Sequence, residues 1–188
     1  MVSLAQLWLP IVLSAVLVFV ASNILHMVLR FWHGPDSRPF SNEDEVAAAI
    51  RKGNAGPGKY MLPYCTPEAM KQPEMMEKLK QGPVGVVFLR APGPMNLGAF
   101  LGQWFLFCLV VSLFAAYLGA HVLAAGTAYL VVFRVVGTAA FLAYAMGVVP
   151  QAIWWGHPWR SAIKHIIDGL IYALLTAGTF GWLWPHAA

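Results

Sequence analysis

The chain has 188 residues, of which 59% are hydrophobic and 11% are charged, with a net charge of +4. Soluble domains are usually about 45–50% apolar and about 25% charged, so this composition excludes an ordinary soluble domain and indicates a membrane protein. Nine of the twelve Lys and Arg residues and seven of the eight acids lie between Arg30 and Arg90. This near balance of charge in the one polar block argues against nucleic acid as a partner.

Four apolar stretches are long enough to cross a bilayer, which takes about 20 residues per helix. We therefore predict an all-α fold: a single integral membrane domain over residues 1–188, built as a four-helix bundle with a cytoplasmic loop block that contains short helices. Pro150 is expected to end the third helix. The predicted helices span residues 4–29, 97–118, 124–149 and 162–183, and the loop block spans residues 31–95.

The first apolar stretch is interpreted as an uncleaved helix. No basic residue precedes Arg30, whereas a secretory signal peptide begins with positive charge. The stretch is also longer than the apolar region of such a peptide, which is about 7–15 residues.

The distribution of basic residues predicts the orientation. Short cytoplasmic segments carry an excess of Lys and Arg. Such residues fill the 31–95 block and recur at Arg160 and Lys164, whereas the 119–125 link has none. Both termini are therefore expected outside and the loop block inside.

Within the loop block, Met70, Met75 and Met76 follow Cys65, and soft sulfur ligands suit Cu(I). An amphipathic helix that buries its methionines explains the same pattern, so none of them is expected to be a ligand. No disulfide to Cys108 is expected, because the cytoplasm is reducing. The stretch GPVGVVFLRAPGP, from residue 82, fits a short strand or an interfacial segment.

The last helix carries a continuous polar line through Asp168. At helical spacing His165 precedes Asp168 and Tyr172 follows it, and the small residues Gly169 and Ala173 run alongside. Small residues allow helices to pack closely in lipid, so this face is expected to meet protein.

A charge at bilayer depth normally finds a partner. Arg134 in the third helix is estimated to lie within about 5 Å of the depth of Asp168, from the rise of about 1.5 Å per residue. We therefore predict a buried pair of Arg134 with Asp168; Lys164 competes for Asp168 but can extend to the interface instead. The pair either fixes helix packing or belongs to an ion or proton path with His165 and Tyr172.

A second polar cluster is expected at the inner end of the first helix, from Asn23, His26 and Arg30. His26 and His165 should lie at similar depth, which makes a haem pair conceivable, and with Asp168 they are candidates for a metal site. Chance explains two such histidines equally well, so no cofactor is expected.

The tail GHPWRSAIKHIIDGLIYALLTAGTFGWLWP resembles the last helix of small, uncharacterised bacterial membrane proteins with about four spans. The shared pattern is a short aromatic and basic loop, a helix with an embedded acid, and a Gly-Trp ending. This resemblance implies a multi-pass inner-membrane protein of unknown function in a bacterium, and it carries over no catalytic residue. In such a membrane, the orientation predicted from the basic residues makes both termini periplasmic.

The chain contains no nucleophile elbow, HExxH motif or phosphate-binding glycine loop, so an enzyme is not favoured. The leading hypothesis is a non-enzymatic scaffold or accessory subunit, whose polar stripe packs against a membrane partner protein or a second copy in the lipid bilayer. The alternative is a small transporter or proton-coupled carrier that uses the Arg134, Asp168 and His165 cluster. The third is a haem- or metal-binding membrane protein.

Overall fold

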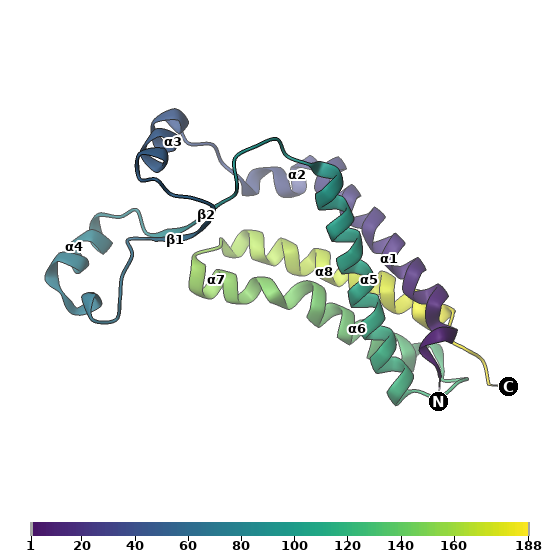
Figure 1. Ribbon diagram of the computed structural model, residues 1–188. Helices are drawn as coiled ribbons and strands as arrows, with labels where there is room; N and C mark the ends of the chain where they lie inside the picture. Colours follow the sequence, from purple (N-terminus) through teal and green to yellow (C-terminus); the bar gives the residue numbers. More distant parts are fainter. Residues whose placement is uncertain (1, 188) are drawn as a thin grey trace. The chain divides into compact units, whose positions relative to one another are not determined.

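The computed structural model describes residues 2–187, which form two compact units. The first unit contains the chain up to Ser37, Asn96–Pro150 and the chain from Pro158 onward. The second unit contains Arg38–Met95 and Gln151–His157. Figure 1 shows that the first unit is a bundle of long helices, and that the start of α1 and the end of α8 lie at the same end of it.

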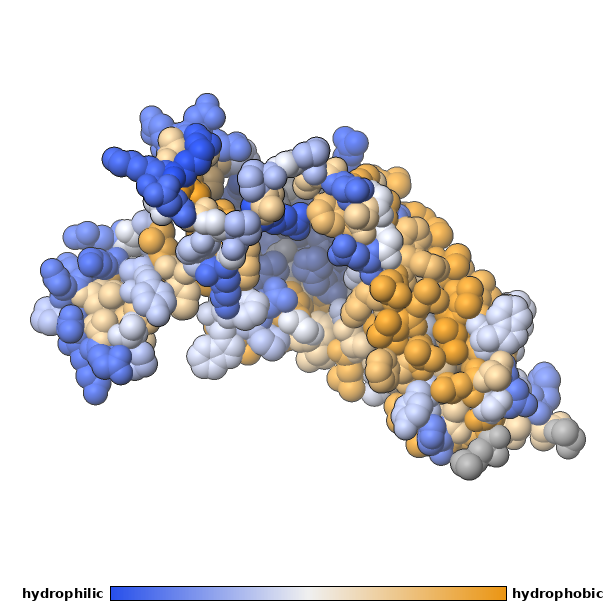
Figure 2. Space-filling view, in the orientation of Figure 1, coloured by the Kyte–Doolittle hydropathy of each residue, from blue (hydrophilic) through white to orange (hydrophobic). Residues whose placement is uncertain are grey.

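Four helices are long and apolar enough to cross a membrane, as predicted. The visible surface along the middle of these helices is mostly hydrophobic, with polar residues at both ends (Figure 2). The first runs over Leu4–Val28 and combines a 3₁₀ turn, η1 (Leu4–Leu7), with α1 (Trp8–Asn23) and a π-helical turn, η2 (Ile24–Val28). The others are α5 (Leu97–Val122), the run of α6 (Tyr129–Ala145), η5 (Met146–Val148) and α7 (Val149–Trp155), and α8 (Trp159–Trp182).

The third helix begins later and ends later than predicted. It starts at Tyr129 instead of residue 124, and it continues past Pro150 to Trp155. Proline is tolerated in the first turn of a helix, where its missing N–H has no helical partner. The 3₁₀ turn η5 creates such a first turn by separating α6 from α7, so Pro150 does not end the helix.

Helices α6 and α8 pack closely because small residues at their contact let the two backbones approach each other. A Cβ placed on Gly169 of α8 would lie 2.8 Å from the Cα of Ala145. A Cβ on Gly137 of α6 would lie 2.9 Å from the Cβ of Ala177. The predicted small-residue face of the last helix therefore does meet protein.

Apolar side chains fill the bundle near the end where α1 starts and α8 finishes. Leu7, Val132, Val136 and Phe180 are fully buried there, and Trp184 packs on the same cluster. The Trp184 indole N–H donates to the Ala124 carbonyl oxygen, 2.9 Å away. This end of the bundle is therefore closed by apolar packing, and the buried charges lie toward the other end.

Within the second unit, two strands form an antiparallel ribbon, in which β1 (Gly58–Leu62) pairs with β2 (Gly85–Leu89). The strand alternative for the GPVGVVFLRAPGP stretch is confirmed by β2. The short helices of the unit are α3 (Glu43–Lys52), η4 (Ala69–Lys71) and α4 (Pro73–Gln81). Cys65 lies in this unit and Cys108 is buried in α5, and both are free thiols.

The α6–α8 contact gives a direct test of this packing. Replacing Gly169 with alanine places a methyl group against the backbone of Ala145, so Gly169→Ala is expected to lower the free energy of unfolding by about 1–3 kcal/mol. Gly102 in α5 is the matched control, because a Cβ there meets nothing within 4 Å. Gly102→Ala should leave stability unchanged or raise it slightly. Thermal unfolding in detergent measures both, and equal stability of the two variants would contradict the packing.

Candidate metal centre

The first three turns of α8 bury two charged side chains. Asp168 is 1% exposed and Lys164 is 8% exposed. A charged group removed from water costs several kcal/mol of free energy unless it is paired and hydrogen-bonded. The partners of these two residues therefore decide how the bundle is built at this end.

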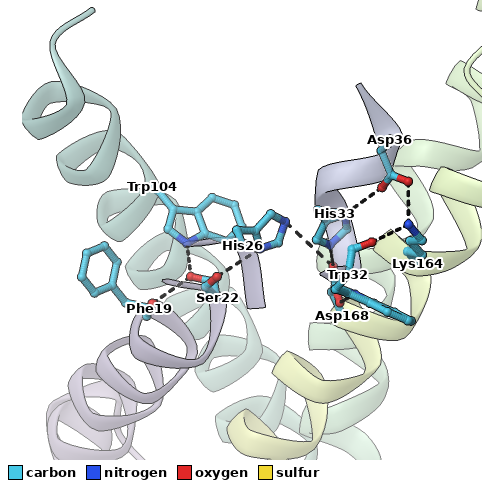
Figure 3. Close-up of polar contacts among 9 residues, drawn as sticks. All are labelled: Phe19, Ser22, His26, Trp32, His33, Asp36, Trp104, Lys164 and Asp168. Carbon is cyan, nitrogen blue, oxygen red and sulfur yellow. Dashed lines mark hydrogen bonds and ion pairs between the residues drawn. The ribbon is translucent and has the colours of Figure 1, made fainter. Parts of the chain in front are cut away.

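The partners of Asp168 come from the segment that follows the first long helix. The π-helical turn η2 ends at Leu29, whose ψ of 65° leaves the helical region, and α2 (Arg30–His33) and η3 (Gly34–Asp36) follow. This bend brings Trp32 and His33 onto α8 (Figure 3). The Trp32 indole N–H donates to Asp168 Oδ1 at 2.8 Å, and His33 Nε2 lies 2.6 Å from Asp168 Oδ2.

The opposite side of His33 faces a second acid, Asp36. His33 Nδ1 lies 3.0 Å from Asp36 Oδ2, and Lys164 Nζ donates to Asp36 Oδ1 at 2.6 Å. Lys164 also donates to the Trp32 carbonyl oxygen. Burial alone would raise the pKa of the Asp36 carboxyl, but hydrogen bonds from Lys164, His33 and Ser161 outweigh burial and lower it from 3.8 to about 2. Asp36 is therefore an ionised acceptor that orients His33.

His26 approaches from the π-helical turn, and its tautomer is fixed by the backbone. Its Nδ1 lies 3.0 Å from the Ser22 carbonyl oxygen, which only accepts, so Nδ1 carries the proton. Its Nε2 lone pair is left facing Asp168 Oδ2 at 3.9 Å. The Ser22 hydroxyl accepts a hydrogen bond from the Trp104 indole N–H at 2.7 Å, which ties this turn to α5 (Figure 3).

His165 of α8 completes the cluster. The ring of His33 stacks against the ring of His26, with centroids 4.2 Å apart, and against the ring of His165, with centroids 4.9 Å apart. One ligand atom from each of His26, His33, His165 and Asp168 lies within 4.8 Å of all the others. We call these four residues the His₃Asp cluster.

The His₃Asp cluster has the donor set of a transition-metal site. Imidazole nitrogen and carboxylate oxygen bind zinc at about 2.0–2.2 Å, usually four ligands in a tetrahedron. Metal-binding histidines commonly donate their other ring N–H to a carbonyl or a carboxylate. Ser22 supplies the carbonyl for His26, and Asp36 supplies the carboxylate for His33. A metal ion would replace the hydrogen bond between His33 Nε2 and Asp168 Oδ2.

The haem pair considered from the sequence does not fit this geometry. His26 and His165 lie with ring centroids 6.1 Å apart, but the ring of His33 stacks on both of them. A flat macrocycle between His26 and His165 would have to occupy the space of the His33 ring. The cluster therefore suits a single ion and not a bis-histidine haem.

The structure does not bring Arg134 and Asp168 together, so the predicted pair is corrected. The buried line of α6 is Val132, Val136 and Ala140, and Arg134 lies between these positions on the exposed face. Within residues 2–187, Arg134 forms no ion pair, and the charged partner of Lys164 is Asp36 instead of Asp168. The depth estimate did not include the rotation of α6 about its axis.

The other predicted site residues lie beside the cluster. Tyr172 follows Asp168 by one turn, is 4% exposed and packs against the rings of Trp104 and Tyr144. Its hydroxyl has no hydrogen-bond partner in the described part of the chain. The Asn23 amide donates to the Phe19 carbonyl oxygen of its own helix, and Arg30 makes no ion pair within the described residues. The predicted polar cluster at the inner end therefore contributes only His26.

Three contributors were absent from the predicted site: Trp32, His33 and Asp36. The available signal was the stretch HMVLRFWHGPD, which places two histidines seven residues apart and an acid just beyond them. The expected burial of the loop-block methionines is wrong for two of them, because Met70 is 56% exposed and Met76 is 46% exposed.

Comparisons with protein-family models, with curated proteins and with solved structures give no match. Function is therefore inferred from the chemistry of the His₃Asp cluster and its surroundings.

The Asp36–Lys164 pair should contribute strongly to stability because both side chains are largely buried, at 14% and 10% exposed. Breaking such a pair leaves an uncompensated charge, so Asp36→Asn and Lys164→Met should each cost about 3–5 kcal/mol. The double variant should cost less than the sum, with a coupling of about 1–3 kcal/mol.

The exposed pair of Glu77 and Lys80 is the control, since both side chains are at least 60% exposed. The same cycle there should give a coupling below about 1 kcal/mol. Chemical unfolding in detergent measures both cycles. Additive losses at Asp36 and Lys164 would show that this contact does not form.

Proposed function

We propose that this chain is a multi-pass protein of a bacterial inner membrane that binds one divalent transition-metal ion, best matched by zinc, in the His₃Asp cluster. The four long apolar helices support membrane insertion. The Lys and Arg residues between Arg30 and Arg90, with Arg160 and Lys164, support a cytoplasmic position for that end of the bundle, by the positive-inside rule. The metal site then lies near the cytoplasmic face, with both termini periplasmic.

The metal assignment rests on one observation. Four donor atoms converge, and in three of those side chains the other polar atom already has a hydrogen-bond partner. Nδ1 of His26 contacts the Ser22 carbonyl oxygen, and Nδ1 of His33 contacts the Asp36 carboxylate. Oδ1 of Asp168 accepts a hydrogen bond from the Trp32 indole. A structural ion pair needs one partner for Asp168 and gives no reason for three histidines to gather around it. Imidazole with one carboxylate suits zinc and its neighbours in the first transition row, whereas calcium and magnesium prefer oxygen ligands.

The site differs from that of a soft-metal protein. No cysteine or methionine belongs to the His₃Asp cluster. Copper(I) is bound by thiolate and thioether ligands, so it is not the ion that this donor set selects. The proposed ion is therefore divalent, and its charge also compensates the buried Asp168 carboxylate.

A proton-coupled carrier is the second candidate, and the buried Tyr172 hydroxyl favours it. This hydroxyl lies one turn from Asp168 toward the middle of the bundle, and further along Ser14 and Ser112 share a hydrogen bond of 3.0 Å between α1 and α5. Polar side chains inside a membrane bundle commonly mark ion or proton pathways. The apolar cluster around Leu7, Val136 and Phe180 closes the far end, so a carrier would have to open that packing.

Metal content of the purified full-length protein tests the proposal. After equilibrium dialysis against zinc, the wild-type chain should retain about one ion, the stoichiometry of a mononuclear four-ligand site. His33→Ala and Asp168→Asn should lose it, because each removes one ligand. His121→Ala is the control, since His121 lies at the exposed end of α5 against Tyr117.

Circular dichroism and the elution profile establish that each variant is folded. Cobalt provides a second readout, because cobalt(II) bound in a tetrahedral site absorbs visible light far more strongly, and at longer wavelength, than the hydrated ion. Zinc retention equal in the wild type and the His33 and Asp168 variants would reject the metal site. A folded wild-type protein that binds no ion but dissipates a proton gradient in vesicles would favour the carrier.

A further inference from the structure

The β1–β2 ribbon of the second unit is apolar on both faces. The register pairs Lys59 with Phe88 and Tyr60 with Val87, and side chains alternate between faces along each strand. One face therefore carries Lys59, Met61, Val86 and Phe88, and the other carries Tyr60, Leu62, Val87 and Leu89. A ribbon in water usually keeps one polar face, so this pattern needs an apolar neighbour.

Large apolar side chains are exposed along the whole ribbon. Phe88 is 60% exposed at the Lys59 end, and the others lie toward or beyond the Leu62 end. Leu62 is 49% exposed, and Leu62 and Gly85 form the last pair of the ladder. Beyond this pair lie Tyr64, which is 74% exposed, and Val84, which is 63% exposed. An isolated two-stranded ribbon is marginally stable in water, so a surface that covers this end would also stabilise it.

The ribbon is anchored on a residue that ends a candidate membrane helix. Trp155 is the last residue of the apolar run Tyr129–Trp155. Within the second unit, the Phe88 ring packs edge-on against Trp155 at 6.0 Å, and Lys59 Nζ lies 3.7 Å from the centre of the Trp155 ring. Tryptophan at the end of a membrane helix lies at the level of the lipid headgroups. Lys59 and Phe88 therefore lie close to that level, and Leu62 lies three residues further along β1, about 10 Å away at about 3.3 Å per residue.

We propose that the Leu62 end of the β1–β2 ribbon inserts into the headgroup layer of the membrane that the helices cross. The apolar side chains Leu62, Tyr64 and Val84 enter the boundary with the acyl chains. Charge fits the same surface: Arg38–Met95 carries eight Lys and Arg residues against six Asp and Glu residues, and anionic headgroups attract the excess. This inference rests on membrane insertion of the helices and does not depend on the metal site.

Fluorescence quenching in lipid nanodiscs of phosphatidylcholine and phosphatidylglycerol tests the inference. In full-length protein carrying Cys65→Ser, Cys108 remains, but it is fully buried. A single environment-sensitive NBD label is then placed by Val84→Cys, which lies outside both strands, and separately by Leu62→Cys. The control is Glu77→Cys on α4, where the side chain is 60% exposed.

Labels at residues 62 and 84 should emit at shorter wavelength, respond to lipids that carry a nitroxide near the headgroup, and be shielded from aqueous iodide. The label at residue 77 should emit at longer wavelength, respond little to the nitroxide lipids and be quenched by aqueous iodide. Labels at residues 62 and 84 as accessible to iodide as the label at residue 77 would overturn the inference. Labels shielded from both quenchers would also overturn it, because a protein surface would then cover the ribbon instead of lipid.

Discussion

The architecture of the bundle at the end where α8 begins depends on the compensation of one buried carboxylate. Asp168 lies within an apolar helix and is 1% exposed, so it must be compensated or its burial would oppose folding. The compensation comes from Trp32 and His33, and it requires the chain to bend at Leu29 after the π-helical turn. Single π-helical turns occur frequently at functional sites, and this one also positions His26.

The same hydrogen bonds that hold Asp168 prepare the cluster for a metal ion. Residues 30–37 contain no fully buried side chain, so polar contacts hold this segment on α8. A metal ion bound by His33 of this segment and by His165 and Asp168 of α8 would add its binding free energy to that attachment. Asp36 and Lys164 act through His33 and the Trp32 carbonyl and are positioning residues for the site. The structural role of Asp168 and the proposed metal-binding role are therefore two consequences of one arrangement.

The sequence was sufficient for the parts of the fold that depend on composition and helical spacing. Hydropathy located four membrane-length helices, and the spacing of Gly169 and Ala173 identified the packed face of α8. The sequence was not sufficient where the position of a side chain depends on how one helix is rotated or bent relative to another. Arg134 faces outward because of the rotation of α6, which no local pattern reveals. His33 reaches Asp168 only because the backbone bends at Leu29, a position with no proline or glycine to signal it. His26, His165 and Asp168 were recognised as candidate ligands, but their convergence needed the fold.

X-ray absorption at the zinc edge of the zinc-loaded, full-length protein tests the central claim most directly. Coordination by the His₃Asp cluster predicts a first shell of only nitrogen and oxygen at about 2.0–2.2 Å, with the outer-shell scattering of imidazole rings. A shell containing sulfur at about 2.3 Å would place the ion at a cysteine or methionine instead. That spectrum, or one identical to hydrated zinc, would contradict a metal centre built from His26, His33, His165 and Asp168.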